Sequence, residues 1–261
     1  MGLTRWTRGR VHDLVDSGVW IALIAVVLTG AAARALGLRL PFSMLMMVAL
    51  GSFAVYTLDR LADRVRDRVT KPRRGRFVGR RTALLFTTAV VAAAVAGVLA
   101  LLAGPEVSVL MMLVAVLAAL HLPLKHIPGV KPTYIAAAWL LVVVGLPVVV
   151  ARFPPGRAMG ELGPLGLALL ANVLACDAAD REAEARWLGT GAAWNLARGM
   201  AAAGVVLGVL DRGALRPLSL VPLATFLALL PRRADPEYTS VFVDGALLAG
   251  GLAAWAWMIW V

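Results

Sequence analysis

The stretch TALLFTTAVVAAAVAGVLALLA, residues 82–103, decides the fold class of this chain. It contains no charged residue, and as a helix it is long enough to cross the roughly 30 Å core of a bilayer, for which about 20 apolar residues are needed. A helix satisfies its backbone hydrogen bonds within one segment, as hydrocarbon requires. The stretch therefore predicts a membrane-spanning helix.

Similar apolar stretches occur along the whole chain. Of its 261 residues, 61% are hydrophobic and only 16% are charged, and the mean hydropathy is +0.82. These values are typical of a multi-span membrane protein. None of the stretches alternates apolar and polar residues as barrel strands do. We predict one all-α polytopic bundle over residues 1–261, with about nine spans near residues 17–36, 41–59, 82–103, 106–124, 133–151, 162–177, 191–210, 217–231 and 239–260.

The sixth and eighth stretches are short, so a bundle of eight spans remains an alternative. The amino-terminal arginines lead directly into the first stretch without a small-residue cleavage site, so we interpret that stretch as structure rather than as a removable signal peptide. The lone Cys176 excludes an internal disulfide framework.

The net charge of +11 is concentrated in a way that indicates orientation rather than nucleic-acid binding. Ten Lys and Arg residues lie between residues 60 and 81, as in a cytoplasmic loop under the positive-inside rule. With nine spans, this loop shares a side with the amino terminus and with the loops after the fourth, sixth and eighth spans. We predict a protein of the cytoplasmic (inner) membrane, with its amino terminus inside and its carboxyl terminus outside.

An acidic segment follows the second predicted span. Asp59, Asp63 and Asp67 lie four residues apart, so one helix would carry them on one face. Arginines at 60, 64 and 68 form a parallel stripe, and Pro72 ends the helix. Carboxylate oxygens suit Mg²⁺, and guanidinium groups suit a diphosphate. The alternative is a solvated juxtamembrane helix whose basic residues contact anionic lipid headgroups.

A second acidic segment follows the sixth predicted span. Asp177, Asp180 and Glu184 are spaced by three and four residues and share a helical face. Unpaired charge at the mouth of a span is costly. Both acidic segments fall in loops predicted to lie inside, so we expect them to face one another across one cavity that can hold magnesium and a diphosphate.

These two segments resemble the motifs of the UbiA superfamily of intramembrane prenyltransferases. Members are nine-helix bundles with Asn-Asp-x-x-Asp-x-x-x-Asp after helix two and Asp-x-x-x-Asp after helix six. The first motif and its continuation match Asp63, Asp67, Arg68, Pro72 and Arg74. The second matches Asp180 and Glu184, and Asp177 matches an upstream Asp of many members. A third element, Tyr-x-x-x-Lys, matches His121 to Lys125.

The chain departs from the family pattern at four positions. Asp59 stands at the Asn of the first motif and Arg60 at its first Asp, so a cation replaces a carboxylate. Glu184 replaces the last Asp of the second motif, and His121 replaces the Tyr of the third. Arg60 either adds a diphosphate contact in place of a metal contact or marks a branch with altered or lost chemistry.

The resemblance implies a Mg²⁺-dependent transfer of a prenyl group from an allylic diphosphate to a small lipophilic acceptor within the membrane. It implies catalytic roles for Asp63, Asp67, Asp180 and Glu184, metal binding by these four with Asp59 and Asp177, and diphosphate binding by Arg60, Arg68, Arg74 and Lys125. Two further candidates are His121 and Asp244, the latter an ionisable residue inside the ninth predicted span. Membrane lipids are the other expected partners, and nucleic acid is not expected.

Three other functional classes are less well supported by the residues. A non-catalytic scaffold or lipid-binding protein is the main rival, and Arg60 is its best support. A transporter usually places its ionisable residues near the midplane, often with repeat symmetry, and this chain has no clear repeat. A CDP-alcohol phosphotransferase needs an Asp-Gly…Ala-Arg string that is missing here.

Overall fold

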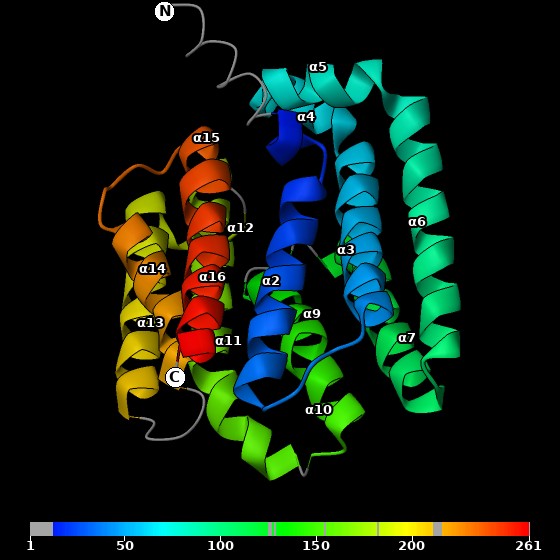
Figure 1. The fold of residues 1–261 in the computed structure, drawn as a ribbon. Helices are drawn as coiled ribbons and strands as arrows, with labels where there is room; N and C mark the ends of the chain where they lie inside the picture. Colours follow the sequence, from blue (N-terminus) through cyan, green and yellow to red (C-terminus); the bar gives the residue numbers. More distant parts are fainter. Residues whose placement is uncertain are drawn as a thin grey trace, which may run out of the picture.

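The computed structural model describes residues 13–124, 127, 129–153, 155–181, 183–210 and 216–260. Over these residues the chain is all-helical and contains no strand (Figure 1). The prediction of an all-α structure is therefore confirmed for the described residues.

Nine apolar helices make up most of the molecule. In chain order they are α2 (Val19–Ala35), α3 (Phe42–Ala62), α6 (Thr82–Leu102), α7 (Pro105–Ala119), α9 (Val130–Leu140), α11 (Pro155–Asp180), α13 (Thr190–Leu210), α14 (Leu220–Leu229) and α16 (Asp244–Trp260).

Shorter elements extend or connect these helices. A π turn, η1 (Leu141–Gly145), joins α9 to α10 (Leu146–Ala151), a 3₁₀ turn, η2 (Arg216–Ser219), leads into α14, and α15 (Pro236–Tyr238) leads through a second π turn, η3 (Thr239–Val243), into α16. The remaining connections contain α4 (Arg64–Thr70), α5 (Pro72–Arg80), α8 (His121–Leu124) and α12 (Ala183–Leu188).

Each of the nine predicted stretches coincides with an apolar helix in the described part of the chain. Six helical segments are long and apolar enough to cross a membrane: 42–62, 82–102, 130–151, 163–180, 190–210 and 236–260. Three others are apolar but shorter, at 19–35, 105–119 and 216–229. The chain is thus a multi-pass helical membrane protein, and the full count of nine spans stays a prediction.

The sixth helix is longer than its apolar stretch predicts. This helix, α11, begins at Pro155 rather than near residue 162. Its first part contains Arg157 and Glu161 and is polar but helical. Only its apolar second half, residues 163–180, has the composition of a span.

The apolar helices form a closed circuit in chain order. Each packs on the next in the series α2, α3, α6, α7, α9, α11, α13, α14 and α16, and α16 packs back on α2. Sequence neighbours are therefore spatial neighbours, as short connections between antiparallel helices favour. The circuit brings the first and last spans of the series together, which Figure 1 shows at the centre of the bundle.

Close approach between helices depends on small residues. A Cβ atom at Gly250 of α16 would lie 2.6 Å from Cα of Val221 in α14, so no side chain fits there. In lipid, helices associate largely through such close packing, because hydrocarbon tails are as apolar as the helices themselves.

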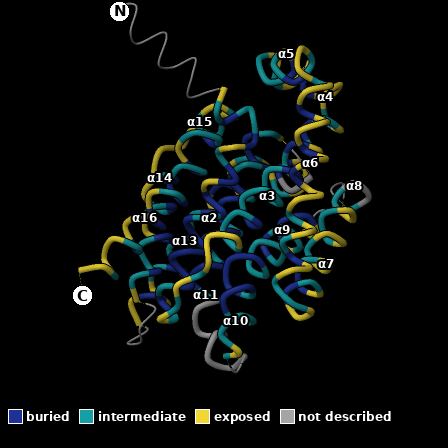
Figure 2. Tube along the Cα trace, turned by 45° about the vertical axis from the view of Figure 1, so that its right-hand side comes forward, coloured by how far each residue is buried: buried dark blue, intermediate teal, exposed yellow. Residues whose placement is uncertain are grey.

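The outer surface of the bundle is apolar, as contact with lipid requires. Leu84, Phe86 and Val91 of α6 and Val109 and Met112 of α7 expose more than half of their surface. Buried positions gather in the middle of the bundle and exposed ones along its outer edges (Figure 2). A water-soluble bundle would carry mainly polar side chains on its outer surface, so the exposed apolar side chains support the assignment to a membrane.

The short helices α4 and α5 cap one end of the bundle, and α5 lies across the direction of the long helices (Figure 1). The first residue of α5 is Pro72, a favoured first position for proline. The predicted end of the preceding helix before Pro72 is confirmed, since α4 ends at Thr70. This end of the molecule holds the acidic segments.

Candidate functional site

The two acidic segments meet at this end of the bundle. The Lys71 ammonium, just after α4, forms an ion pair with the Asp180 carboxylate at the end of α11. A cleft of about 600 Å³ lies between the segments and is also lined by residues 234–236, which lead into α15. The expectation that both segments border one cavity is therefore in accord with the geometry. Its charged lining is Arg66, Asp67, Lys71, Asp180, Arg181, Arg186 and Asp235.

The three aspartates of the first segment do not form one continuous stripe. The helix breaks at Asp63, which lies between α3 and α4 with φ −84° and ψ 1°. Asp59 therefore belongs to α3 and Asp67 to α4, and their side chains have different partners. Single-helix spacing predicted a common face, but the three side chains contact three different partners: His121, Arg66 and Arg74.

Asp67 is fully buried and is held by α5. Its two carboxylate oxygens accept hydrogen bonds from Nε and Nη2 of Arg74, both at 2.8 Å. Burial alone would lower the pKa of Arg74, but its hydrogen bonds and charge attraction with Asp67 outweigh burial and raise that pKa. A bidentate pair of this kind fixes the angle between α4 and α5.

Asp63 has a more open environment. Its carboxylate accepts a hydrogen bond from Arg66 Nη2 at 2.8 Å, three residues further along. The Asp63 side chain is 12% exposed and that of Arg66 is 41% exposed, so this pair is much better solvated than Asp67–Arg74.

The aspartates of the second segment are also bound to cations. Lys131, at the start of α9, donates to Asp177 at 2.5 Å in a buried pair. Asp180 pairs with Lys71, while its second oxygen, Oδ1, is buried and has no hydrogen-bond partner among the described residues. Glu184 belongs to α12, but its side chain lies outside the described residues.

The third predicted element contacts the first. His121 Nε2 lies 3.1 Å from Asp59 Oδ1, and the Tyr134 hydroxyl is hydrogen-bonded to His121 Nδ1. Tyr134 of α9 thus supplies a phenol beside the histidine that stands at the family's tyrosine position. Lys125 lies outside the described residues.

A separate polar cluster lies inside the bundle. Asp244, directly after the π turn of η3, accepts a hydrogen bond from Asn172 Nδ2 at 2.9 Å and is 3.7 Å from Cys176 Sγ. Arg60 is only 9% exposed, and its Nη1 has no hydrogen-bond partner in the described part of the chain. π turns occur often at functional sites.

Asp16 links this interior to the α5 helix. Its carboxylate is 3.2 Å from Arg73 Nη2. Burial raises the pKa of Asp16, and the positive charges of Arg60 and Arg74 oppose that rise. The carboxylates of Asp16 and Asp244 both attract the positive charge of Arg60.

The predicted diphosphate-binding residues are dispersed. Arg74 is engaged by Asp67, and Arg60 belongs to the interior cluster. Arg68 lines a different hollow, which shares no residue with the cleft. Lys71, which was not among the predicted diphosphate ligands, is the cation that lines the cleft and contacts the second segment. In the sequence, the position of Lys71 in the basic loop was the only sign of such a role.

The donor set around the cleft suits a hard cation, although its members stand apart. Within the described residues, no three His, Cys, Asp or Glu side chains converge closely enough to hold a metal. The carboxylates that line the cleft are those of Asp67, Asp180 and Asp235, of which Asp67 pairs with Arg74 and Asp180 with Lys71. The Oδ1 oxygen of Asp180 is buried and accepts no hydrogen bond from a described residue, so it is a suitable oxygen ligand for Mg²⁺.

No model of a known protein family matches this sequence, and no curated protein matches it either. A functional assignment therefore depends on the residues themselves and on their arrangement.

Proposed function

We propose that this membrane protein is a Mg²⁺-dependent prenyltransferase of UbiA type. It would transfer a prenyl group from an allylic diphosphate to a small lipophilic acceptor in the inner membrane. The observation that carries the proposal is the meeting of two acidic segments, far apart in the chain, around one charged cleft at the end of an apolar bundle. A diphosphate bound there would have its isoprenoid tail next to apolar helices.

Residues in the cleft and near it have complementary roles in this proposal. Asp180, with Asp177, Asp67 and Asp63, would hold magnesium, which neutralises the charge that develops on the leaving diphosphate. Lys71 and Lys131 neutralise Asp180 and Asp177 in the free protein. Because a lysine ammonium is a mobile point charge, it can leave a carboxylate and contact a phosphate oxygen instead.

The apolar interior would protect the electron-deficient allylic carbon from water. Asp59, His121 and Tyr134 form a connected polar group at the cleft end of α3, α8 and α9. In this proposal His121 accepts a proton from the acceptor as the new bond forms, and Asp59 stabilises the resulting imidazolium. Glu184 and Lys125 keep the metal and diphosphate roles that the resemblance implies.

A second candidate is a catalytically inactive lipid-binding or scaffold protein of the same fold. Arg60 favours it, because a buried guanidinium stands where the family motif has a metal-binding aspartate. The prenyl-diphosphate binding experiment separates the two candidates, since a scaffold has no need for a metal-dependent diphosphate site.

The test is equilibrium binding of geranyl thiodiphosphate, which resists hydrolysis, to the detergent-purified chain with and without Mg²⁺. We expect binding that requires Mg²⁺ and that is reduced at least about tenfold by Asp180→Asn or Lys71→Gln, the change that a lost charged contact of about 1.4 kcal/mol produces. Asp13→Asn is the matched control, because it removes an exposed carboxylate that does not line the cleft. Mg²⁺-independent binding, or equal binding by all variants, would contradict the proposal.

A further inference from the structure

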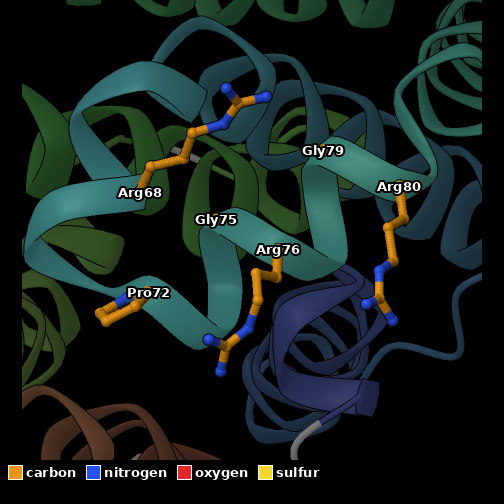
Figure 3. Close-up of a pocket in the computed structure, with 6 residues that line it drawn as sticks. All are labelled: Arg68, Pro72, Gly75, Arg76, Gly79 and Arg80. Atoms are coloured by element: carbon orange, nitrogen blue, oxygen red, sulfur yellow. The ribbon is translucent and has the colours of Figure 1, made fainter.

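A second hollow, of about 400 Å³, lies between α4 and α5 and has no role in the proposed reaction. Figure 3 shows its lining, which is Arg68, Pro72, Gly75, Arg76, Gly79 and Arg80. Half of these residues are arginines, and none is acidic. The hollow is therefore strongly positive.

The arginines of α5 divide into two groups. Arg73 and Arg74 point to the bundle and pair with Asp16 and Asp67. Arg76 and Arg80, one turn apart, are exposed and make no hydrogen bond or ion pair with a described residue. The charge of the second group is therefore available to a ligand.

The floor of the hollow has almost no side chains. Gly75 and Gly79 lie one turn apart with Pro72 in the same row, with Arg68 on one side of the row and Arg76 and Arg80 on the other (Figure 3). A Cβ at Gly75 would be 2.7 Å from the backbone N of Arg68, so glycine is required for α4 and α5 to pack. At Gly79 a Cβ would be 3.5 Å from Arg68 Nη2, so a larger side chain there would enter the hollow.

The position of the hollow indicates an amphiphilic ligand. The helix α5 lies across the end of the bundle (Figure 1) and directly precedes α6, which is long enough to span a membrane, so lipid headgroups are expected near α5. The long helix α6 begins two residues after Arg80 and exposes the apolar side chains of Leu84 and Phe86. Acyl chains beside α6 would thus leave a headgroup close to the arginines.

We propose that this hollow binds the phosphate of an anionic phospholipid headgroup. Guanidinium groups bind phosphate oxygens through paired N–H donors, and basic residues next to a span attract anionic lipids. The proposal is independent of the prenyltransferase function, because the hollow and the cleft share no residue. A free phosphate ion could contact the same arginines, but it has no acyl chains to pack on the exposed apolar face of α6.

Native mass spectrometry of the full chain in a neutral detergent tests this. The probes are phosphatidylglycerol, phosphatidylcholine with the same acyl chains, and glycerol phosphate as the free anion. We expect tight binding of phosphatidylglycerol only, weakened roughly fivefold by Arg76→Gln or by Arg80→Gln. Gly79→Leu should weaken binding with every charge retained, because it fills the hollow. Arg64→Gln is the matched control, an exposed arginine of α4 outside the hollow.

Three results would overturn the proposal. Equal weakening by Arg64→Gln and Arg76→Gln would show a diffuse attraction instead of a site. Equal binding of phosphatidylcholine would exclude a role for the anionic charge, and equal binding of glycerol phosphate would identify a free-anion site. If Gly79→Leu fails to fold, the two arginine variants decide the question, since both side chains are exposed.

Discussion

Asp67 and Asp63 lie one helical turn apart in the sequence and differ sharply in environment. Asp67 is fully buried in a bidentate pair with Arg74, whereas Asp63 contacts a half-exposed Arg66. Breaking a fully buried pair leaves an uncompensated charge away from water, whereas the exposed Arg66 can be solvated when the Asp63 carboxylate is removed. The two aspartates therefore allow a matched comparison of stability.

We expect Asp67→Asn to lower the free energy of unfolding by about 3–5 kcal/mol, because Arg74 would lose its charged partner. Asp63→Asn should cost less than about 1 kcal/mol. Denaturant unfolding in mixed micelles measures both. Equal losses for the two variants would show that the Asp67–Arg74 pair does not hold α5 against α4.

The Lys71–Asp180 pair is the direct link between the two acidic segments, and its strength can be measured separately from catalysis. Both side chains are mostly buried, at 16% and 19% exposed. A double-mutant cycle of Lys71→Gln and Asp180→Asn should give a coupling free energy of about 1 kcal/mol in metal-free protein. Mg²⁺ together with the prenyl thiodiphosphate should reduce that coupling, if the lysine moves to phosphate.

A coupling near zero in the metal-free protein would mean that the two segments are held near each other by the surrounding helices alone. Asp13→Asn combined with Lys71→Gln is the control cycle, for which additive effects are expected. Distant sites without shared partners are usually additive.

The sequence predicted which residues carry charge at this end, but not their pairs. Asp59, Asp63 and Asp67 were expected on one face, and the break at Asp63 separates them. Lys131 and Tyr134 come from α9 and reach Asp177 and His121 only because α9 packs beside α11 and near α8. The spacing of residues within one helix does not predict such contacts between different helices.

At the scale of elements, the lengths of the apolar stretches predicted the positions of the helices. The hydropathy pattern did not predict the details of their backbone. All nine apolar stretches coincide with described helices, because a run of apolar residues in lipid leaves helix as the way to satisfy the backbone. The π turns η1 and η3 and the early start of α11 had no clear counterpart in hydropathy. These features depend on how each helix packs on its neighbours.

Gly250 provides a test of that packing. The change Gly250→Ala places a methyl group 2.6 Å from the backbone of Val221, so α14 and α16 would have to separate. We expect a loss of about 1–3 kcal/mol in the free energy of unfolding, as for other overpacked interiors.

Gly97→Ala is the matched control, because a Cβ at Gly97 of α6 has no neighbour within 4 Å among the described residues. It should change stability by no more than about 1 kcal/mol, in the stabilising direction. If both variants change the free energy of unfolding by the same amount, helix propensity explains both changes. The close contact between α14 and α16 would then make no contribution.

At the scale of the whole molecule, the closed circuit of helices puts the loops into two sets at opposite ends. The acidic segments, α4, α5 and the start of α9 lie at one end, joined by Lys71–Asp180 and Lys131–Asp177. The connection between α2 and α3 lies at the other (Figure 1). The concentration of basic residues at the first end predicts that it faces the cytoplasm.

Cysteine labelling tests this orientation. In a Cys176→Ser background, which removes the lone native thiol, Arg64→Cys and Arg39→Cys place exposed thiols at opposite ends of the bundle. We expect a membrane-impermeant maleimide, added to intact cells, to label the variant at residue 39 and to spare the one at residue 64. Opening the cells should make both reactive.

The reverse pattern would invert the orientation and put the acidic cleft outside, where the soluble prenyl diphosphates of the cell interior do not reach it. Labelling of both thiols in intact cells would contradict a fixed orientation with the two loops on different sides. Because the measurement depends only on the side of each thiol, it tests the membrane topology whether or not the cleft binds a diphosphate. The cleft can serve as a prenyl-transfer site only if residue 64 is on the inside.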